Sequence, residues 1–167
     1  MTYHLNPWFW ATLLGTPEAW FALAVGGGLF YLGYRRHLQH RREVKAFLEV
    51  MIISLLVVFA LVQVLKIATD LPRPCGPENP YCRDDPSFPS GHAATGFVFF
   101  TALFLYDRKS WPLFLVPVLV AFSRAALGVH TWADVLAGSL IGILLTLGVW
   151  RLLRLAWRRP PPRTARR

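Results

Sequence analysis

The residues best suited to chemistry fall in three short clusters, each at one end of a long apolar stretch. The clusters are Lys66-Ile-Ala-Thr-Asp-Leu-Pro-Arg73-Pro74, Pro89-Ser90-Gly91-His92, and Ser123-Arg124 followed by His130 and Asp134. Ionisable side chains at the ends of apolar segments are costly and tend to be functional. Together the clusters supply cations, histidines, a carboxylate, a hydroxyl and a glycine turn, a set suited to an oxyanion.

Three of these residues are cations that could hold an anion with several oxygens. Lys66, Arg73 and Arg124 would neutralise and orient it, with arginine binding in bidentate fashion. Ser90-Gly91-His92 is expected to begin a helix, where free backbone N–H groups and the positive end of the helix dipole favour phosphate. These features indicate a phosphate-binding site.

His130 and Asp134 are spaced for nucleophilic catalysis. One helical turn separates them, so both side chains can lie on one face. A carboxylate that holds one imidazole nitrogen fixes the tautomer and leaves the other nitrogen free to attack. His92 then remains as the general acid that protonates a leaving oxygen. The residues therefore predict phosphoryl transfer with histidine as covalent nucleophile, and we expect no metal and no cofactor.

The three clusters together resemble the signature of the type 2 phosphatidic acid phosphatases: Lys-x6-Arg-Pro, Pro-Ser-Gly-His and Ser-Arg-x5-His-x3-Asp. The resemblance covers about residues 45 to 150, and every signature position is matched. It implies an integral membrane phosphatase that acts on lipid phosphates or diphosphates through a phosphohistidine on His130. It also implies that His92 is the acid and that Asp134 supports His130. The residues to which the resemblance assigns phosphate binding are Lys66, Arg73, Ser90, Gly91 and Arg124.

The composition is that of a membrane protein. The 167 residues are 54% hydrophobic and only 16% charged, with a mean hydropathy of +0.40, whereas ordinary soluble domains carry roughly a quarter charged residues. The net charge of +9 could suggest nucleic-acid binding, but the charges lie in short clusters between long apolar runs. We therefore expect the lipid bilayer and a lipid phosphate substrate as partners, and no nucleic acid. The oligomeric state is left open.

The apolar runs predict an all-α bundle of about five transmembrane helices, forming a single domain over residues 1–157. A helix that crosses the hydrocarbon core needs about 20 mostly apolar residues. The expected spans are residues 18–34, 44–67, 92–106, 111–127 and 132–155. Pro117 is expected to kink the fourth span, and the small residues Ala137, Gly138, Ser139 and Gly142 permit close packing of the fifth. Residues 5–15 suggest an interfacial helix, and residues 158–167 a disordered basic tail.

The basic residues predict the orientation. A cluster of five Lys and Arg lies around the connection between the first and second spans, and a cluster of two lies between the third and fourth. A cluster of seven ends the fifth span and fills the tail, so the three clusters hold 14 of the 18 such residues. Because cytoplasmic segments carry the excess of basic residues, these clusters are assigned to the cytoplasm together with the C-terminus. The candidate site then lies on the external or periplasmic face of the cell membrane.

Cys75 and Cys82 are the only cysteines, and both fall in the loop before the third span. The expected orientation places this loop in an oxidising compartment. The six residues between them include two prolines and a glycine, so the chain can turn back within the Cα separation of a disulfide. We expect a Cys75–Cys82 disulfide, with two free thiols or a metal pair as the alternatives.

Two other functions fit parts of the pattern. A vanadate-dependent haloperoxidase shares the phosphate-site motifs, but five spans and a short chain argue against a soluble enzyme of that kind. A catalytically silent scaffold or transporter-like protein would not need a nucleophile, an acid and an anion clamp. The substrate stays open among undecaprenyl diphosphate, phosphatidylglycerophosphate, phosphatidate and lipid A phosphate, and the external site slightly favours a carrier-lipid diphosphate.

Overall fold

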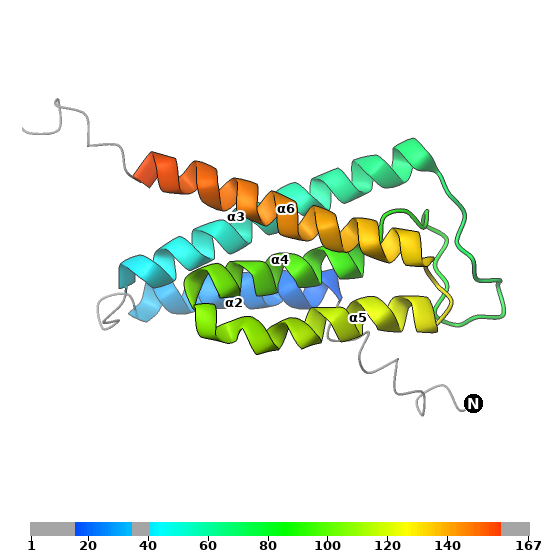
Figure 1. The fold of residues 1–167 in the computed structure, drawn as a ribbon, viewed down its shortest axis with the longest axis horizontal. Coiled ribbons are helices and arrows are strands. Elements are labelled where there is room, and N and C mark those ends of the chain that lie inside the picture. Colours follow the sequence, from blue (N-terminus) through cyan, green and yellow to red (C-terminus); the bar gives the residue numbers. More distant parts are fainter. Residues whose placement is uncertain (1–15, 35–40, 158–167) are drawn as a thin grey trace, which may run out of the picture.

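The described part of the chain is a bundle of helices. The computed structural model describes residues 16–34 and 41–157, and these two ranges contain no strand (Figure 1). The elements in chain order are α2 (Pro17–Tyr34), α3 (Arg41–Thr69), α4 (Gly91–Tyr106), the 3₁₀ helix η2 (Arg108–Phe114), α5 (Leu115–Ala126) and α6 (Trp132–Trp157). The all-helical fold class is thereby confirmed for these residues. The expected interfacial helix over residues 5–15 and the tail over residues 158–167 lie outside the described residues.

Two of the described helices are long and apolar enough to cross a membrane. They cover Arg42–Thr69, with 28 residues, and Trp132–Trp157, with 26 residues. Glu18–Phe30 and Gly91–Tyr106 are shorter apolar helices, so the count of five spans stays a prediction. The outer surface of the bundle is apolar, and its exposed side chains include Leu29, Leu56, Val64, Leu140 and Leu144. Large exposed apolar surface is rare on soluble monomers and suits contact with lipid.

Local signals set the ends of the helices that carry the clusters. Lys66 lies in the last turn of α3, where a cation complements the helix dipole. The chain leaves α3 at Asp70, whose φ of 44° cannot continue a helix. Ser90 caps the start of α4, because its side chain accepts a hydrogen bond from the backbone N–H of Ala93. The ends of the apolar helices therefore coincide with the residues that could do chemistry.

The fourth expected span, over residues 111–127, differs from the structure. Its first part is the 3₁₀ helix η2, which contains Pro112, and the α-helix begins only at Leu115. Pro117 lies in the first turn of α5, and the kink that we expected there stays a prediction. Backbone N–H groups in a first turn have no partner within the helix, so proline is tolerated there. The break comes before Pro117, at the change of helix type.

Helix α4 lies at the centre of the bundle and is mostly buried; Figure 1 shows it between α2, α5 and α6. Two glycines of α6 allow the close approach of these helices. A Cβ atom at Gly138 would collide with the carbonyl oxygen of Ser90, and one at Gly142 with that of Ala94. The predicted role of small residues in the fifth span is thus confirmed at these two positions, and the contact holds the start of α4 against the start of α6.

Trp20 fixes α2 to the same core. Its side chain is buried, and its ring lies 4.6 Å from that of Phe99 and 5.7 Å from that of Phe100, measured between centroids. Aromatic pairs at such distances stabilise packing beyond the area they bury. This contact lies in the second half of α4, whereas Glu18, also in the first turn of α2, lines a cavity together with Lys66 and Gly91.

The glycine contact predicts unequal effects of two alanine substitutions in α6. Gly142→Ala should lower the free energy of unfolding by about 1–3 kcal/mol, because the added methyl group forces α6 away from α4. Gly148→Ala is the matched control: its Cβ would meet nothing within 4 Å, so it should be neutral or stabilising by about 0.5–1 kcal/mol. Thermal unfolding of the detergent-solubilised variants measures both, and a Gly142→Ala protein as stable as the control would contradict this packing.

Candidate active site

The three clusters meet at one end of the bundle. This end holds the last turn of α3, the loop after it, the first turn of α4, the last turn of α5 and the first turn of α6 (Figure 1). The opposite end holds the start of α3 and the end of α6. The basic residues of those two segments are therefore remote from the clusters, as the charge pattern predicts.

A capping box holds Asp134 in place at the start of α6. The backbone N–H of Thr131 donates to Oδ2 of Asp134 over 2.7 Å, and the backbone N–H of Asp134 donates to Oγ1 of Thr131 over 3.2 Å. These reciprocal bonds satisfy two donors at the helix start. The backbone carbonyl of Asp134 also accepts a 3.0 Å bond from the N–H of Ser90. The carboxylate is therefore buried and fixed before any ligand binds.

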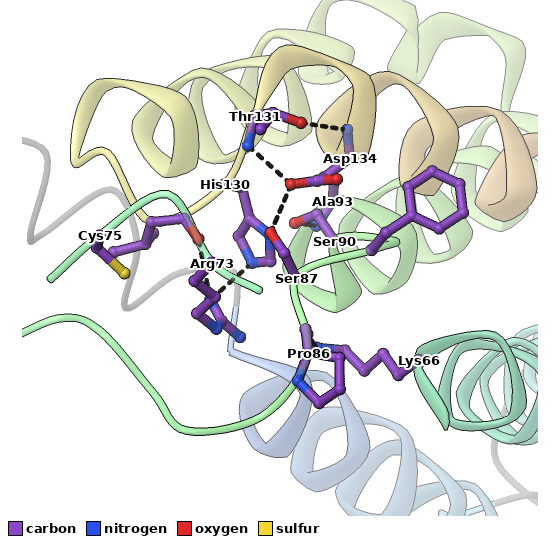
Figure 2. Close-up of polar contacts among 12 residues, drawn as sticks. Lys66, Arg73, Cys75, Pro86, Ser87, Ser90, Ala93, His130, Thr131 and Asp134 are labelled. Carbon is purple, nitrogen blue, oxygen red and sulfur yellow. Dashed lines mark hydrogen bonds and ion pairs between the residues drawn. The ribbon is translucent and has the colours of Figure 1, made fainter. Parts of the chain in front are cut away.

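The ring of His130 lies between Asp134 and Arg73 (Figure 2). Its Nε2 is 3.1 Å from Nη1 of Arg73. Because a guanidinium can only donate, Nε2 accepts this bond, and the proton of the neutral ring is assigned to Nδ1. Nδ1 is 3.6 Å from Oδ2 of Asp134, which is too long for a hydrogen bond. The expected pair is brought together, but without a direct bond between its two members.

Ser87 fills the space between these two side chains, and the sequence analysis missed it. Its Oγ lies 3.3 Å from Nδ1 of His130 and donates to Oδ2 of Asp134 over 2.6 Å. The sequence feature that could have pointed to Ser87 is its position three residues before Ser90. The loop must bring the chain back to the start of the next helix there.

Asp85 is the second residue that the sequence analysis missed. Its Oδ2 is 2.5 Å from Nζ of Lys66, and its Oδ1 is 2.8 Å from Nη2 of Arg73. Nζ of Lys66 also donates to the carbonyl oxygen of Pro86, and Nε of Arg73 donates to the carbonyl oxygen of Asp85 over 2.9 Å. The Asp85 carboxylate thus forms ion pairs with two of the three cations that we expected to bind phosphate.

The remaining expected residues surround this centre. Arg124 is buried, and its carbonyl oxygen accepts bonds of 3.2 Å and 3.3 Å from the N–H groups of Val129 and His130. The turn between them passes through Gly128, whose φ of 67° favours glycine. His92 is buried in the first turn of α4.

A cavity of about 110 Å³ opens beside His130. Its lining combines the cations and Asp85 with apolar side chains of α3 and with the first turns of α2 and α4. The lining residues are Glu18, Phe59, Val62, Gln63, Lys66, Arg73, Arg83, Asp85, Gly91, Thr95 and His130. A charged group could therefore reach His130 with an apolar group alongside α3.

Two loop groups at the site have shifted pKa values. Burial raises the pKa of Asp85, but the hydrogen bond from Lys66 and the charge of Arg73 outweigh it and hold this pKa below its usual value. Burial and the positive charge of Arg73 lower the pKa of His130 to about 3. Arg124 and Lys66 act in the same direction on His130. The imidazole is therefore neutral at neutral pH, as a nucleophile must be.

The expected disulfide between Cys75 and Cys82 is confirmed, with a Cα–Cα distance of 5.9 Å. The two alternatives, free thiols and a metal pair, are thereby wrong. Nδ2 of Asn79, inside the closed loop, donates to the carbonyl oxygen of Leu127 over 2.9 Å. The loop that follows Arg73 is therefore anchored to the end of α5.

Residues 45–158 match the model of the PAP2 superfamily. Among curated proteins, the chain is 39% identical over 67 residues to the bacitracin transport permease protein BcrC of Bacillus licheniformis, covering 40% of this chain and 33% of that protein. It is 37% identical over 101 residues to the undecaprenyl-diphosphatase of Sulfolobus acidocaldarius, covering 55% of this chain and 48% of that protein. The chain thus spans less than half the length of both curated relatives.

Two solved structures are similar in fold and 25% identical in sequence. The PAP2 type phosphatidylglycerolphosphate phosphatase of Bacillus subtilis superposes with a TM-score of 0.71, covering 96% of this chain and 81% of that chain. The LpxE protein of Aquifex aeolicus gives a TM-score of 0.58, covering 86% and 83% of the two chains.

The position of Asp85 predicts competition with bound anions. In Asp85→Asn, Lys66 and Arg73 lose their counter-charge, so inorganic phosphate should bind about tenfold more tightly, the effect of one hydrogen bond to a charged group. Isothermal titration calorimetry of the detergent-solubilised protein measures the affinity. Asp84→Asn is the matched control, because Asp84 is exposed and should leave the affinity unchanged. Weaker phosphate binding in Asp85→Asn would show that Asp85 organises the cations rather than competes for them.

The lowered pKa of His130 predicts a ring that stays neutral in acid. Its ¹⁵N side-chain NMR signals, assigned by their loss in His130→Gln, should remain those of neutral imidazole at pH 5. Between the ordinary histidine pKa of about 6.5 and the folded value of about 3, only the unfolded chain takes up this proton. His130 should therefore reduce stability progressively as the pH falls through that range. A protonation midpoint near 6.5 in the folded protein would contradict the assignment.

Proposed function

This chain belongs to the PAP2 superfamily, and we propose that it is a membrane phosphatase that hydrolyses a lipid phosphate or lipid diphosphate. The observation that carries the proposal is a cavity that joins His130 to Lys66 and Arg73 at one end of an apolar bundle. A neutral imidazole beside paired cations is suited to attack on a bound phosphate.

Substrate binding begins with an exchange of anions. The phosphate takes the place of the Asp85 carboxylate on Lys66 and Arg73, and Arg124 binds a further oxygen. The backbone N–H of Gly91 faces the anion from the start of α4, where the helix dipole is positive. As Arg73 turns toward the phosphate, its Nη1 leaves Nε2 of His130 and frees the lone pair of this nitrogen.

The reaction then proceeds through a covalent intermediate. Nε2 of His130 attacks phosphorus, the bond from phosphorus to the lipid oxygen breaks, and His92 gives its proton to that oxygen. Water next attacks the phosphohistidine, His92 takes a proton from the water, and inorganic phosphate leaves with His130 restored. The cations stabilise the charge on the equatorial oxygens in both steps.

Several relatives support a lipid substrate. One curated relative is named an undecaprenyl-diphosphatase, and one similar structure is a phosphatidylglycerolphosphate phosphatase. The apolar outer surface allows the acyl or prenyl tail to stay in the bilayer while the head group enters the cavity. We propose the external or periplasmic face for this site and the cytoplasm for the C-terminus, since the basic segments lie at the opposite end of the bundle.

Loss of the nucleophile tests this function. His130→Ala should lower phosphate release from a lipid phosphate by about a thousandfold or more, which corresponds to roughly 4 kcal/mol of barrier. The assay measures inorganic phosphate released from detergent-solubilised lipid phosphates and diphosphates. His37→Ala, in the basic segment between α2 and α3, serves as the control and should keep wild-type activity.

The same assay with EDTA examines the need for a metal ion. Activity should survive the chelator, because cations of the protein supply the electrophilic groups. Vanadate should inhibit as a mimic of the trigonal-bipyramidal phosphoryl group. If EDTA abolished activity and magnesium restored it, the metal-free mechanism would be refuted.

For the preceding experiment, a His130→Ala protein that keeps a tenth of the wild-type rate would refute the covalent role of His130.

A further inference from the structure

Ser87 occupies a position that the proposed reaction does not yet use. It lies in the loop between the disulfide and α4, and only 2% of its surface is exposed. Its backbone N–H donates to the carbonyl oxygen of Leu71 over 2.8 Å, so the loop is held against the chain that leaves α3. The buried hydroxyl points between His130 and Asp134 (Figure 2).

The chemistry of its two neighbours determines whether this hydroxyl donates or accepts in each of its hydrogen bonds. An ionised carboxylate only accepts, so the Ser87 O–H is the donor in the 2.6 Å contact with Oδ2 of Asp134. A lone pair of the same oxygen is then left to accept the proton on Nδ1 of His130, at 3.3 Å. The direct separation of 3.6 Å between Nδ1 and Oδ2 is too long to provide this link. The hydrogen-bonded path from the carboxylate to the ring therefore passes through Ser87.

We propose that Ser87 is a positioning residue that couples Asp134 to His130 and keeps the imidazole in the tautomer with its proton on Nδ1. The proposal rests on the proposed function, in which Nε2 of His130 attacks phosphorus. With Nδ1 protonated, Nε2 carries the lone pair that the attack requires. The carboxylate, acting through the polarised hydroxyl, stabilises the positive charge that develops on the ring in the attack, and such polarised chains of hydrogen bonds strengthen one another.

Each end of this chain of bonds is fixed independently, which makes the hydroxyl an effective orienting group. The capping box holds the Asp134 carboxylate through Thr131, and the Leu71 carbonyl holds the backbone of Ser87. The ring of His130 is the remaining mobile member, and Ser87 restricts its rotation on the side opposite Arg73.

Ser87→Ala tests the proposal with Ser54→Ala as its matched control. Ser54 is equally buried, in α3, and its hydroxyl has no hydrogen-bond partner among the described residues. In Ser87→Ala we expect kcat to fall by about 10- to 100-fold, the effect of one hydrogen bond to a charged group, with KM nearly unchanged because the cations remain. Ser54→Ala should keep the wild-type kcat. Ser87→Thr retains the hydroxyl and should recover most of the lost rate.

The tautomer of His130 provides a readout that a purely structural role would not change. ¹⁵N NMR is best recorded in the Arg73→Ala background, because the Arg73 guanidinium donates to Nε2 and would fix the tautomer by itself. In Arg73→Ala without ligand the ring should keep its proton on Nδ1, and adding Ser87→Ala should give a mixture of both tautomers. An Arg73→Ala ring protonated on Nε2 would overturn the proposal. So would a Ser87→Ala protein with the kcat of Ser54→Ala, or a loss of rate that Ser87→Thr does not recover.

These outcomes are separable from failure of the proposed function. If wild-type protein releases no phosphate from any lipid, or if His130→Ala remains active, then the covalent mechanism fails. The tautomer measurement needs no turnover and still decides whether Ser87 links the two side chains. Because Arg73→Ala retains Ser87, its tautomer is informative even if Ser87→Ala folds poorly.

Discussion

The need to neutralise buried positive charge organises one whole end of this molecule. The side chains of Lys66 and Arg73 are only 6% and 5% exposed, whereas that of Asp85 is 44% exposed. A buried cation without a partner is strongly unfavourable, so the carboxylate of Asp85 draws the loop before α4 against the end of α3. Arg73 extends the same network to Val129 and His130, just before α6. Segments far apart in the chain are thus held together by shared charges.

Under the proposed mechanism, the same network would keep the ligand-free site closed to reaction. Asp85 occupies the cations, and the guanidinium of Arg73 occupies the lone pair of the expected nucleophile. In the proposed mechanism, an incoming phosphate replaces Asp85 on the cations and reorients Arg73 by offering it better acceptors. Binding and activation of the nucleophile would then be one event. On this proposal, the imidazole would become reactive only after an anion has entered.

The packing of the apolar helices fixes the positions of the residues at this polar end. Close contact of α4 with α6 at Gly138 and Gly142 sets the distance between Ser90 and Asp134, because one residue lies at the start of each helix. The polar site therefore depends on packing that lies deeper in the bundle. A cavity with charged walls on one side and α3 side chains on the other fits an amphiphile, whose head group and tail need different surroundings.

The sequence by itself determined the elements and residues that depend on short-range physics. Apolar length specified α2, α3, α4 and α6, and the Cys75–Cys82 closure followed from a turn of six residues. The motifs identified the cations, His130 and Asp134, because their chemistry is written in residue type and spacing. The start of the fourth span was misjudged, since whether a proline interrupts a helix or begins one depends on where the first helical turn forms.

Only the tertiary structure decided the roles open to Ser87 and Asp85. Both lie in a loop without regular structure, where no periodicity indicates which side chains turn inward. Their side-chain partners are 12 to 47 residues away in the chain. Sequence spacing likewise could not decide how Asp134 is linked to His130. One helical turn brings the two side chains near each other. Whether they bond directly or through Ser87 depends on a distance difference of less than about 1 Å, which is set by how the loop, α4 and α6 pack together.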